Sequence, residues 1–237
     1  MTRLRQETTS VTIDSTQKAC IFCNGQLNNP VKVRQIAKDC DLLIAADGGA
    51  RYCLDIGLIP QVIIGEMDSV DSDTWKSRSG TEHIRYPADK DRSDEELAVQ
   101  YALKHGCEQV ILVAATGGRL DQTLGNVALV AGYPGRVAIL DGVSTLVAVD
   151  KSEKCVLHGK IGTVVSLMPY GSGPLTVKTN GLKYPLQQER LQSATHGLSN
   201  ELSQTEACVC VSDGILLVYI QNQDTYGVRL NENDDSR

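Results

Sequence analysis

The first part of the chain, up to about residue 143, alternates short apolar runs with segments of helical periodicity. We interpret the apolar runs as buried strands. Strands that alternate with helices favour a parallel sheet with helices on its faces. Ligands of such sheets bind beyond the carboxyl ends of the strands, which here carry polar or glycine-rich loops. The expected strands cover residues 19–23, 42–46, 62–64 and 110–115, and the expected helices cover 31–38, 50–56, 95–105 and 122–130.

From about residue 143 the chain consists of short β-rich runs separated by Gly, Pro, Asn and Asp. This pattern is typical of a small antiparallel sandwich or barrel. The expected strands are 143–149, 163–168, 175–179, 207–211 and 215–221. The sequence therefore predicts an α/β N-terminal domain with a mostly parallel sheet and a smaller all-β C-terminal domain. We expect a flexible tail at 1–16, the α/β domain at 17–143, the β-rich domain at 144–230 and a flexible tail at 231–237.

Charge and hydropathy argue against two classes of partner. A net charge of −6 and a pI near 5.2 do not provide the basic face that nucleic acid needs. No stretch approaches the roughly 18 apolar residues of a membrane span, and residues 1–14 lack the apolar run of a secretory signal. We expect a cytoplasmic protein.

Cys20 and Cys23 form a CxxC motif, and the sequence has no second CxxC motif that would complete a pair. Buried reduced thiols therefore fit better than zinc or redox chemistry.

Acidic side chains crowd into two short segments of the first part. Glu66 and Asp68 follow the third expected strand, and Asp89, Asp91 and Asp94 precede an expected helix. Carboxylates this dense repel one another unless a cation is present. Mg²⁺ binds oxygen ligands and usually arrives with a substrate's phosphates. A carboxylate at a helix start can also simply offset the helix macrodipole. For Asp94 alone this alternative has about equal weight, but it does not explain the other four carboxylates.

A paired-glycine loop follows the fourth expected strand. Gly117 and Gly118 allow close approach to a phosphate, and the next helix begins directly after them. Arg119 adds a planar donor fork suited to phosphate oxygens. A purely structural turn is the alternative, and no GxxxxGK[ST] loop is present. Asp47, which also ends a strand, either caps the next helix or faces a ligand.

Six short blocks of this sequence, in this order, resemble the thiamine pyrophosphokinase family. Each block alone is weak evidence, but six in order at family-like spacing are specific. The resemblance extends from residue 18 to residue 219. The blocks are Ala-Asp-Gly-Gly-Ala at 46–50, Gly-Glu-Met-Asp-Ser at 65–69, Asp-Lys-Asp-Arg-Ser-Asp at 89–94, Gly-Gly-Arg-Leu-Asp-Gln at 117–122, Gly-Leu-Lys-Tyr at 181–184 and Leu-Ser-Asn-Glu at 198–201.

The resemblance implies a homodimer that moves a pyrophosphoryl group from ATP to the hydroxyl of thiamine, with AMP leaving. It implies catalytic residues Asp68, Asp91, Asp94 and Asp121, and Mg²⁺ ligands Glu66, Asp68, Asp91 and Asp94. The implied contacts to ATP and its phosphates are Asn24, Gly25, Asp47, Gly48, Lys90, Gly117, Gly118 and Arg119. The implied thiamine-binding residues, at the dimer interface, are Gln122, Tyr184, Ser199 and Asn200.

The expected reaction is in-line attack of the alcohol on the β-phosphorus of ATP. Such transfers need mainly positioning and charge neutralisation. The hypothesis for the base is Asp68 or Asp121. Two positions depart from the bacterial pattern: Glu66 stands where Asp is typical, and Gln122 stands where His is usual. Gln cannot carry a proton's charge at neutral pH, so acid-base work at that position is not expected.

Two alternative functions remain open from the sequence. One is a related diphosphokinase that acts on another small alcohol, such as a hydroxymethylpterin. The other is a non-catalytic homologue that binds thiamine without consuming ATP. The blocks around Tyr184 and Ser199 favour thiamine, and the retained acidic cluster argues against a protein without catalysis.

Overall fold

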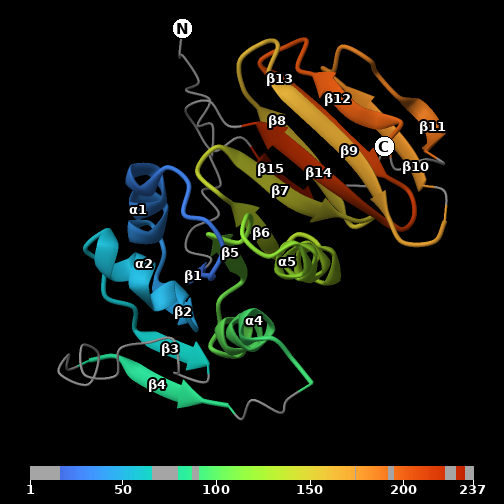
Figure 1. Cartoon of the computed structure of the whole chain (residues 1–237). Helices are drawn as coiled ribbons and strands as arrows, with labels where there is room; N and C mark the ends of the chain where they lie inside the picture. Colours follow the sequence, from blue (N-terminus) through green and yellow to red (C-terminus); the bar gives the residue numbers. More distant parts are fainter. Residues whose placement is uncertain are drawn as a thin grey trace, which may run out of the picture.

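A computed structural model of the protein describes residues 17–65, 80–86, 91–173, 175–191, 195–221 and 228–232. Within these ranges ten strands form one continuous sheet, in the order β12-β9-β14-β7-β6-β5-β1-β2-β3-β4 (Figure 1). Five further strands form a second sheet, in the order β11-β10-β13-β8-β15. No helix in the described ranges is long and apolar enough to cross a membrane.

The half of the large sheet from β6 to β4 is parallel. β1 pairs with β2 on one side, with Ala19 opposite Leu42, and with β5 on the other. The chain runs outward from β1 to β4 and then returns to β5, so the strand order reverses between β1 and β5. Such a switch point leaves a crevice at the carboxyl ends of the strands. The strands are β1 Lys18–Phe22, β2 Leu42–Ala46, β3 Val62–Gly65, β4 Glu82–Arg85, β5 Gln109–Val113 and β6 Val137–Leu140.

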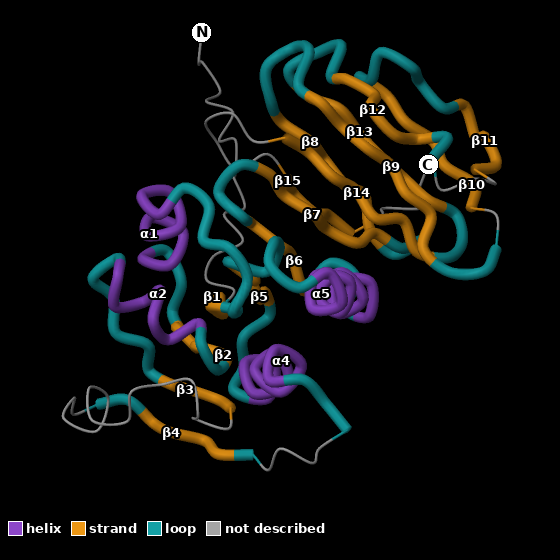
Figure 2. Tube along the Cα trace, in the orientation of Figure 1, coloured by secondary structure: helices purple, strands orange, loops and turns teal. Residues whose placement is uncertain are grey.

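Helices cover both faces of the parallel half (Figure 2). The alternation along β1 explains why both faces are buried, since successive strand residues point to opposite sides. Phe22 packs with residues of α1 and α2, whereas Ile21 packs with residues of α4 and α5. Both side chains are fully buried. The helices are α1 Pro30–Lys38, α2 Gly49–Asp55, α4 Asp94–Lys104 and α5 Leu120–Gly132.

The other half of the large sheet is antiparallel and packs against the five-stranded sheet as a sandwich. Val147 and Val218 of the large sheet share a buried cluster with Leu157 and Val209 of the small one. On the opposite face, α5 contacts β7 and β14 as well as β6, and so links the two halves. The strands are β7 Ser144–Val149, β8 Glu153–His158, β9 Val164–Tyr170, β10 Leu175–Asn180, β11 Gln187–Leu191, β12 Gly197–Glu201, β13 Glu206–Val211, β14 Ile215–Gln221 and β15 Val228–Glu232.

The predicted fold class is confirmed, with one unexpected feature of its layout. The expected elements of the first part are all present, with ends shifted by no more than two residues. The predicted domain boundary at 143/144 falls in the turn between β6 and β7, but these strands pair with each other. The sheet is therefore continuous across that point, and the division into domains stays a prediction. β15 extends two residues into the expected C-terminal tail, and the segments 1–16 and 233–237 lie outside the described residues.

The cysteines are reduced, as expected, but they are not all buried. All eight are free thiols, and Cys20 and Cys23 of the CxxC are fully buried. Cys208 and Cys210 are two residues apart in β13 and therefore share one face of this strand. That face is the outer one, because Val209 between them is buried in the sandwich while both thiols are partly exposed.

Candidate active site

A cleft of about 350 Å³ lies at the carboxyl ends of β1, β2 and β5. Its walls are the loops after these strands and the first turns of α4 and α5. This is the switch point of the parallel sheet, where ligand sites of open α/β sheets form. The lining residues are Asn24, Gly25, Asp47, Arg92, Ser93, Asp94, Glu95, Ala115, Gly117, Arg119, Gln122 and Asn126.

The loops after β1 and β5 are joined through their backbones. The Gly25 N–H donates to the Ala114 carbonyl at 2.8 Å, and the Gln26 N–H donates to the Thr116 carbonyl at 2.7 Å. Glycine is required at position 25, because a Cβ there would lie 2.4 Å from the Thr116 oxygen. From α2, the Tyr52 hydroxyl donates to the Gly25 carbonyl at 2.5 Å. The floor of the cleft is thus a fixed backbone assembly.

The loop after β2 brings Asp47 to the cleft. Asp47 has a left-handed backbone with φ 44°, and its N–H donates to the Ile64 carbonyl at 2.8 Å. The N-cap position of α2 is Gly48 rather than Asp47, and Asp47 lines the cleft. Gly48 packs so closely on the Asn24 side chain that a Cβ would lie 2.5 Å from Oδ1.

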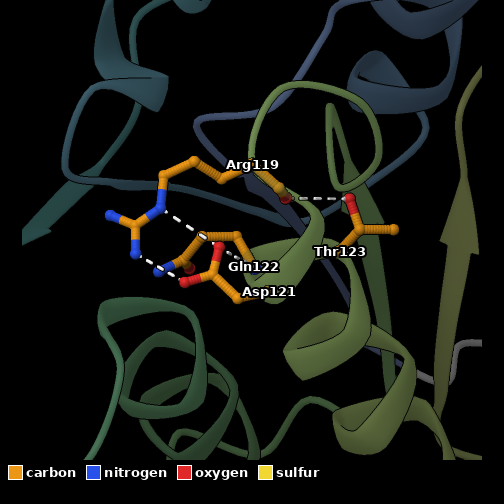
Figure 3. Close-up of polar contacts among 4 residues, drawn as sticks. All are labelled: Arg119, Asp121, Gln122 and Thr123. Carbon is orange, nitrogen blue, oxygen red and sulfur yellow. Dashed lines mark hydrogen bonds and ion pairs between the residues drawn. The ribbon is translucent and has the colours of Figure 1, made fainter.

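Arg119 and Asp121 form a two-point ion pair at the start of α5 (Figure 3). Arg119 donates from Nε at 3.1 Å and from Nη2 at 2.6 Å to the two carboxylate oxygens of Asp121. The hydrogen bonds from Arg119 lower the pKa of the Asp121 carboxyl, and the same pairing raises the pKa of Arg119. Both side chains are largely exposed. The pair is therefore accessible to an incoming anion that competes for the guanidinium.

The start of α4 contributes carboxylates to the opposite wall. Ser93 caps the helix, with its Oγ accepting from the Glu96 N–H at 3.2 Å. Asp94 and Glu95 follow at the cleft wall. Glu95 is only 8% exposed. Burial raises the pKa of its carboxyl, and the nearby charges of Asp94 and Asp47 raise it further.

Some of the predicted metal ligands lie within the described residues and others lie outside them. Asp94 lines the cleft, and Asp91 lies three residues before it on the same segment. Glu66, Asp68, Asp89 and Lys90 lie outside the described residues. Within the described ranges, no group of three or more His, Cys, Asp or Glu side chains is arranged to hold a metal ion. The complete metal set therefore stays a prediction.

The predicted thiamine residues of the C-terminal half do not line this cleft in the same chain. Asn200, 6% exposed, holds the backbone of Tyr184: its Oδ1 accepts from the Tyr184 N–H at 3.1 Å, and its Nδ2 donates to the Tyr184 carbonyl at 2.8 Å. The Tyr184 ring is 61% exposed, with the Lys183 ammonium 5.6 Å from its centre. Ser199 has a left-handed backbone with φ 57°. Asn200 thus positions Tyr184, and Gln122 alone of the four predicted residues lies at the cleft.

Sequence reasoning did not name seven residues that build the cleft: Arg92, Ser93, Glu95, Ala115 and Asn126 line it, and Tyr52 and Gln26 hold its loops. Glu95 could not be distinguished in the sequence from Asp94 and Glu96, the other acidic residues in the first turn of α4. Asn126 could have been found, because it lies four residues after Gln122 and therefore on the same face of α5.

Comparison with known proteins identifies the same two halves. A family model described as "Thiamin pyrophosphokinase, catalytic domain" matches residues 33–137, and one described as "Thiamin pyrophosphokinase, vitamin B1 binding domain" matches residues 146–216. The thiamine pyrophosphokinase of Bacillus subtilis is 28% identical over 189 residues, covering 75% of this chain and 86% of that protein. Thiamine pyrophosphokinase 2 of Arabidopsis thaliana is 26% identical over 216 residues, covering 78% of this chain and 79% of the relative.

Solved structures share the fold. The crystal structure of the Bacillus subtilis thiamine pyrophosphokinase aligns with a TM-score of 0.76 at 23% identity, over 88% of this chain and 100% of that one. The thiamin pyrophosphokinase from Candida albicans aligns with a TM-score of 0.73 at 19% identity, over 88% and 90% of the two chains. With both family models matched in chain order on the two halves of one fold, the protein belongs to the thiamin pyrophosphokinase family.

Proposed function

We propose that the protein transfers a pyrophosphoryl group from ATP to the hydroxyl of thiamine, giving thiamine diphosphate and AMP. The observation that carries the proposal is the switch-point cleft, which combines the glycine loop after β5, Arg119 and the acidic start of α4. The match of a vitamin B1 binding model to residues 146–216 supports thiamine over a pterin as the alcohol. Cytoplasmic location stays a prediction.

The triphosphate is proposed to lie against the loop after β5. Gly117 and Gly118 both have left-handed backbones, with φ 77° and 66°. Consecutive exposed amides in such a loop form a concave site for phosphate oxygens. Arg119 is the nearby cation, and its exposed pairing with Asp121 costs little to exchange for a phosphate. The proposed ATP contacts are Asn24, Gly25, Asp47, Gly48, Gly117, Gly118 and Arg119, with Lys90 added from outside the described residues.

The donor chemistry of the cleft fits Mg²⁺. Asp47, Asp94 and Glu95 bring carboxylates to it, and the first two raise the pKa of the third, so they lie within electrostatic reach of one another. Mg²⁺ takes oxygen ligands and is commonly bound by one or two carboxylates together with phosphates. We propose Asp91, Asp94, Glu66 and Asp68 as its holders. When bound, the ion neutralises charge on the phosphates during the transfer.

Arg119 is proposed to exchange its bond to Asp121 for one to a phosphate of ATP, and this exchange gives Asp121 a role in the reaction. While Arg119 is bound to it, the lowered pKa of Asp121 makes this carboxylate a weak base. A phosphate that draws Arg119 away restores the basicity of Asp121 beside the bound triphosphate. Asp121 then accepts the alcohol proton as the hydroxyl attacks the β-phosphorus and AMP leaves. Asp68 remains the other candidate base. If Asp68→Asn and Asp121→Asn both leave turnover intact, neither carboxylate is the base.

Thiamine binding is proposed to require a second copy of the chain. Tyr184 and Ser199 do not line the cleft of their own chain, while Tyr184 presents an open aromatic face to a cationic ring. Large apolar side chains are exposed beside both regions. Leu120 and Leu124, four residues apart on α5, are 72% and 58% exposed, and Leu198 beside Ser199 is 43% exposed. A dimer that covers these side chains would bring Tyr184 of one chain to the α5 of the other.

Mixed dimers test the shared site. Arg119→Ala and Tyr184→Ala are each expected to be inactive as homodimers. Co-expressed at equal levels, they should recover about a quarter of wild-type sites, because half of the dimers are mixed and each mixed dimer has one intact site. Absence of recovery, with a mixed dimer confirmed by mass, would place both residues in one chain's site.

The activity is tested by following AMP release from ATP with each candidate alcohol. The proposal predicts AMP and thiamine diphosphate in equal amounts with thiamine, and no AMP with a hydroxymethylpterin. Turnover with the pterin alone would assign the related diphosphokinase reaction. Thiamine binding without AMP release, under the same conditions, would assign a non-catalytic binding protein.

A further inference from the structure

Asn126 is a buried polar residue at the floor of the cleft. It lies on the inward face of α5, is 4% exposed and lines the cleft beside Ala115 and Gly117. Its Nδ2 donates to the Ala115 carbonyl at 2.9 Å. A carbonyl oxygen can only accept, so this contact fixes which end of the amide faces the loop. The other end, Oδ1, has no hydrogen-bond partner among the described residues.

Asn126 completes a row of three fixed carbonyls in the glycine loop. The Ala114 carbonyl accepts from the Gly25 N–H, and the Thr116 carbonyl accepts from the Gln26 N–H. The Ala115 carbonyl, between them, accepts from Asn126 and from no other group in the described ranges. The two outer bonds are backbone contacts from the loop after β1, which most side-chain substitutions would keep. The middle bond depends on one side chain.

Fixing a carbonyl also fixes the next amide. All described peptide bonds are trans, and the C=O and N–H of a trans peptide point in opposite directions. Asn126 therefore sets the direction of the Thr116 N–H, while Gln26 sets that of the Gly117 N–H. In the described part of the chain, neither amide has a hydrogen-bond partner. Of these two residues Gly117 lines the cleft, where an unpartnered amide is available to a phosphate oxygen.

We infer that Asn126 is a positioning residue for ATP, which acts by holding the Ala115 peptide so that the glycine loop keeps its phosphate-binding shape. The inference rests on the proposed function, because it requires that this loop receive the triphosphate. The bond from Asn126 joins two groups of the protein itself, so it can hold the loop in shape without a contribution from ATP. Pre-organisation of this kind lowers the cost of ordering a loop upon binding.

The isosteric substitution Asn126→Asp tests the inference. It keeps the size of the side chain but replaces the donor to Ala115 by a second acceptor, so the middle bond is lost. Because it also adds a negative charge at the cleft, the uncharged Asn126→Ser variant described below is measured beside it. We expect the Kd for a non-hydrolysable ATP analogue with Mg²⁺, measured by calorimetry, to rise about tenfold, the effect of one lost hydrogen bond of ordinary strength. The KM for ATP should rise in parallel, and the KM for thiamine should change by less than about twofold.

Two further variants separate positioning from general destabilisation. The serine side chain of Asn126→Ser is too short to reach Ala115, so this variant should weaken binding of the analogue to a similar extent. It replaces Asn126→Asp in the test if that variant folds poorly. Thr179→Val is the matched control, because Thr179 is 3% exposed and its Oγ1 accepts from the Leu186 N–H at 2.8 Å in the other half of the protein. It should lower the Tm and leave the affinity for the analogue unchanged.

The outcomes distinguish this inference from the proposed function. If the wild-type protein neither binds the analogue nor forms AMP, the proposed function fails. If the wild-type protein does both, and the Asn126 variants bind the analogue within about twofold of wild type while their Tm falls, then Asn126 is merely structural and the inference is overturned.

Discussion

Gly25→Ala should disturb the cleft at the junction between β1 and β5. The new Cβ would lie 2.4 Å from the Thr116 oxygen and 2.5 Å from the Ala114 oxygen. Real Cβ atoms essentially never approach closer than 3.0 Å, so the two loops must separate by about 0.6 Å, as overpacked interiors do. The bonds from the Gly25 and Gln26 amides, now 2.8 and 2.7 Å, would lengthen to roughly 3.3–3.4 Å, beyond the usual range.

The cost of this separation is calculated from the two weakened bonds. Each is worth about 0.5–1.5 kcal/mol, so the free energy of unfolding should fall by about 1–3 kcal/mol. For a protein of this size that lowers the Tm by roughly 2–12 °C. The displaced glycine loop should also lower kcat/KM for ATP by roughly ten- to hundredfold, because active sites tolerate misplacement of this order poorly.

Thermal unfolding and steady-state kinetics measure both effects of Gly25→Ala. Gly132→Ala is the matched control: Gly132 lies in α5, and a Cβ there meets no atom within 4 Å. Alanine in a helix should raise stability by about 0.5–1 kcal/mol and leave turnover intact. If Gly25→Ala keeps the wild-type Tm and the wild-type kcat/KM, the two loops are not joined as described.

Four further predictions follow from the cleft. Burial raises the pKa of Glu95 above its value in the unfolded chain, so the charged carboxylate destabilises the folded protein at neutral pH but not below the unfolded pKa. Measured without Mg²⁺ or ATP, Glu95→Gln should therefore raise the Tm near pH 7, and this gain should vanish near pH 4. Thermal melts at the two pH values check the sign, and an unchanged Tm near pH 7 would contradict it. Arg119→Lys loses the planar fork and should lower kcat/KM for ATP, while the Tm stays within about 1 °C because the pair is exposed; a large fall in Tm would show a structural role instead. Tyr52→Phe removes the hydroxyl that donates to Gly25 and should reduce the free energy of unfolding by about 0.5–1.5 kcal/mol in urea titrations; an unchanged midpoint would mean that this bond is not formed. Removal of divalent cations with EDTA should abolish AMP formation and added Mg²⁺ should restore it, whereas full activity in EDTA would rule out the metal-dependent mechanism.

The parallel half of the fold could be predicted because local and global signals agree there. Each strand of β1, β2, β3 and β5 is buried on both faces, so it appears in the sequence as an uninterrupted apolar run. The loops that end β1, β2 and β5 carry polar residues or glycine and meet at one edge of the sheet. Their convergence on a single cleft could therefore be predicted from the sequence as well.

The sequence did not predict six strands, β4, β6, β8, β11, β12 and β15. Two of them, β4 and β11, lack that signal for a physical reason. β4 is the edge strand, with the sequence Glu-His-Ile-Arg and no buried residue, so neither apolar content nor alternation marks it. β11 is also an edge strand, in which four of five residues are exposed. The continuity of the large sheet could not be foreseen, because the pairing of β6 with β7 depends on where the chain returns and not on local composition.

The residue types of the site could be predicted, but the hydrogen bonds and ion pairs between them could not. The resemblance indicated Arg119 and Asp121 separately, and only the three-dimensional arrangement shows that they bind each other in the unliganded protein. Asn200 was expected at the ligand and instead holds the Tyr184 backbone. Asn126 shares a face of α5 with the predicted Gln122, but its bond to the Ala115 carbonyl could not be predicted, because it depends on the bend at Ala114, whose left-handed φ of 50° no residue type there indicates.

The fate of each phosphate of ATP tests the central claim most directly. The protein is incubated with thiamine, Mg²⁺ and ATP labelled at the α- or the β-phosphorus, and the products are separated by chromatography. Attack of the alcohol on the β-phosphorus predicts that the β label enters thiamine diphosphate and the α label enters AMP, in equal amounts. Recovery of the β label in ADP, with thiamine monophosphate as the other product, would contradict the account.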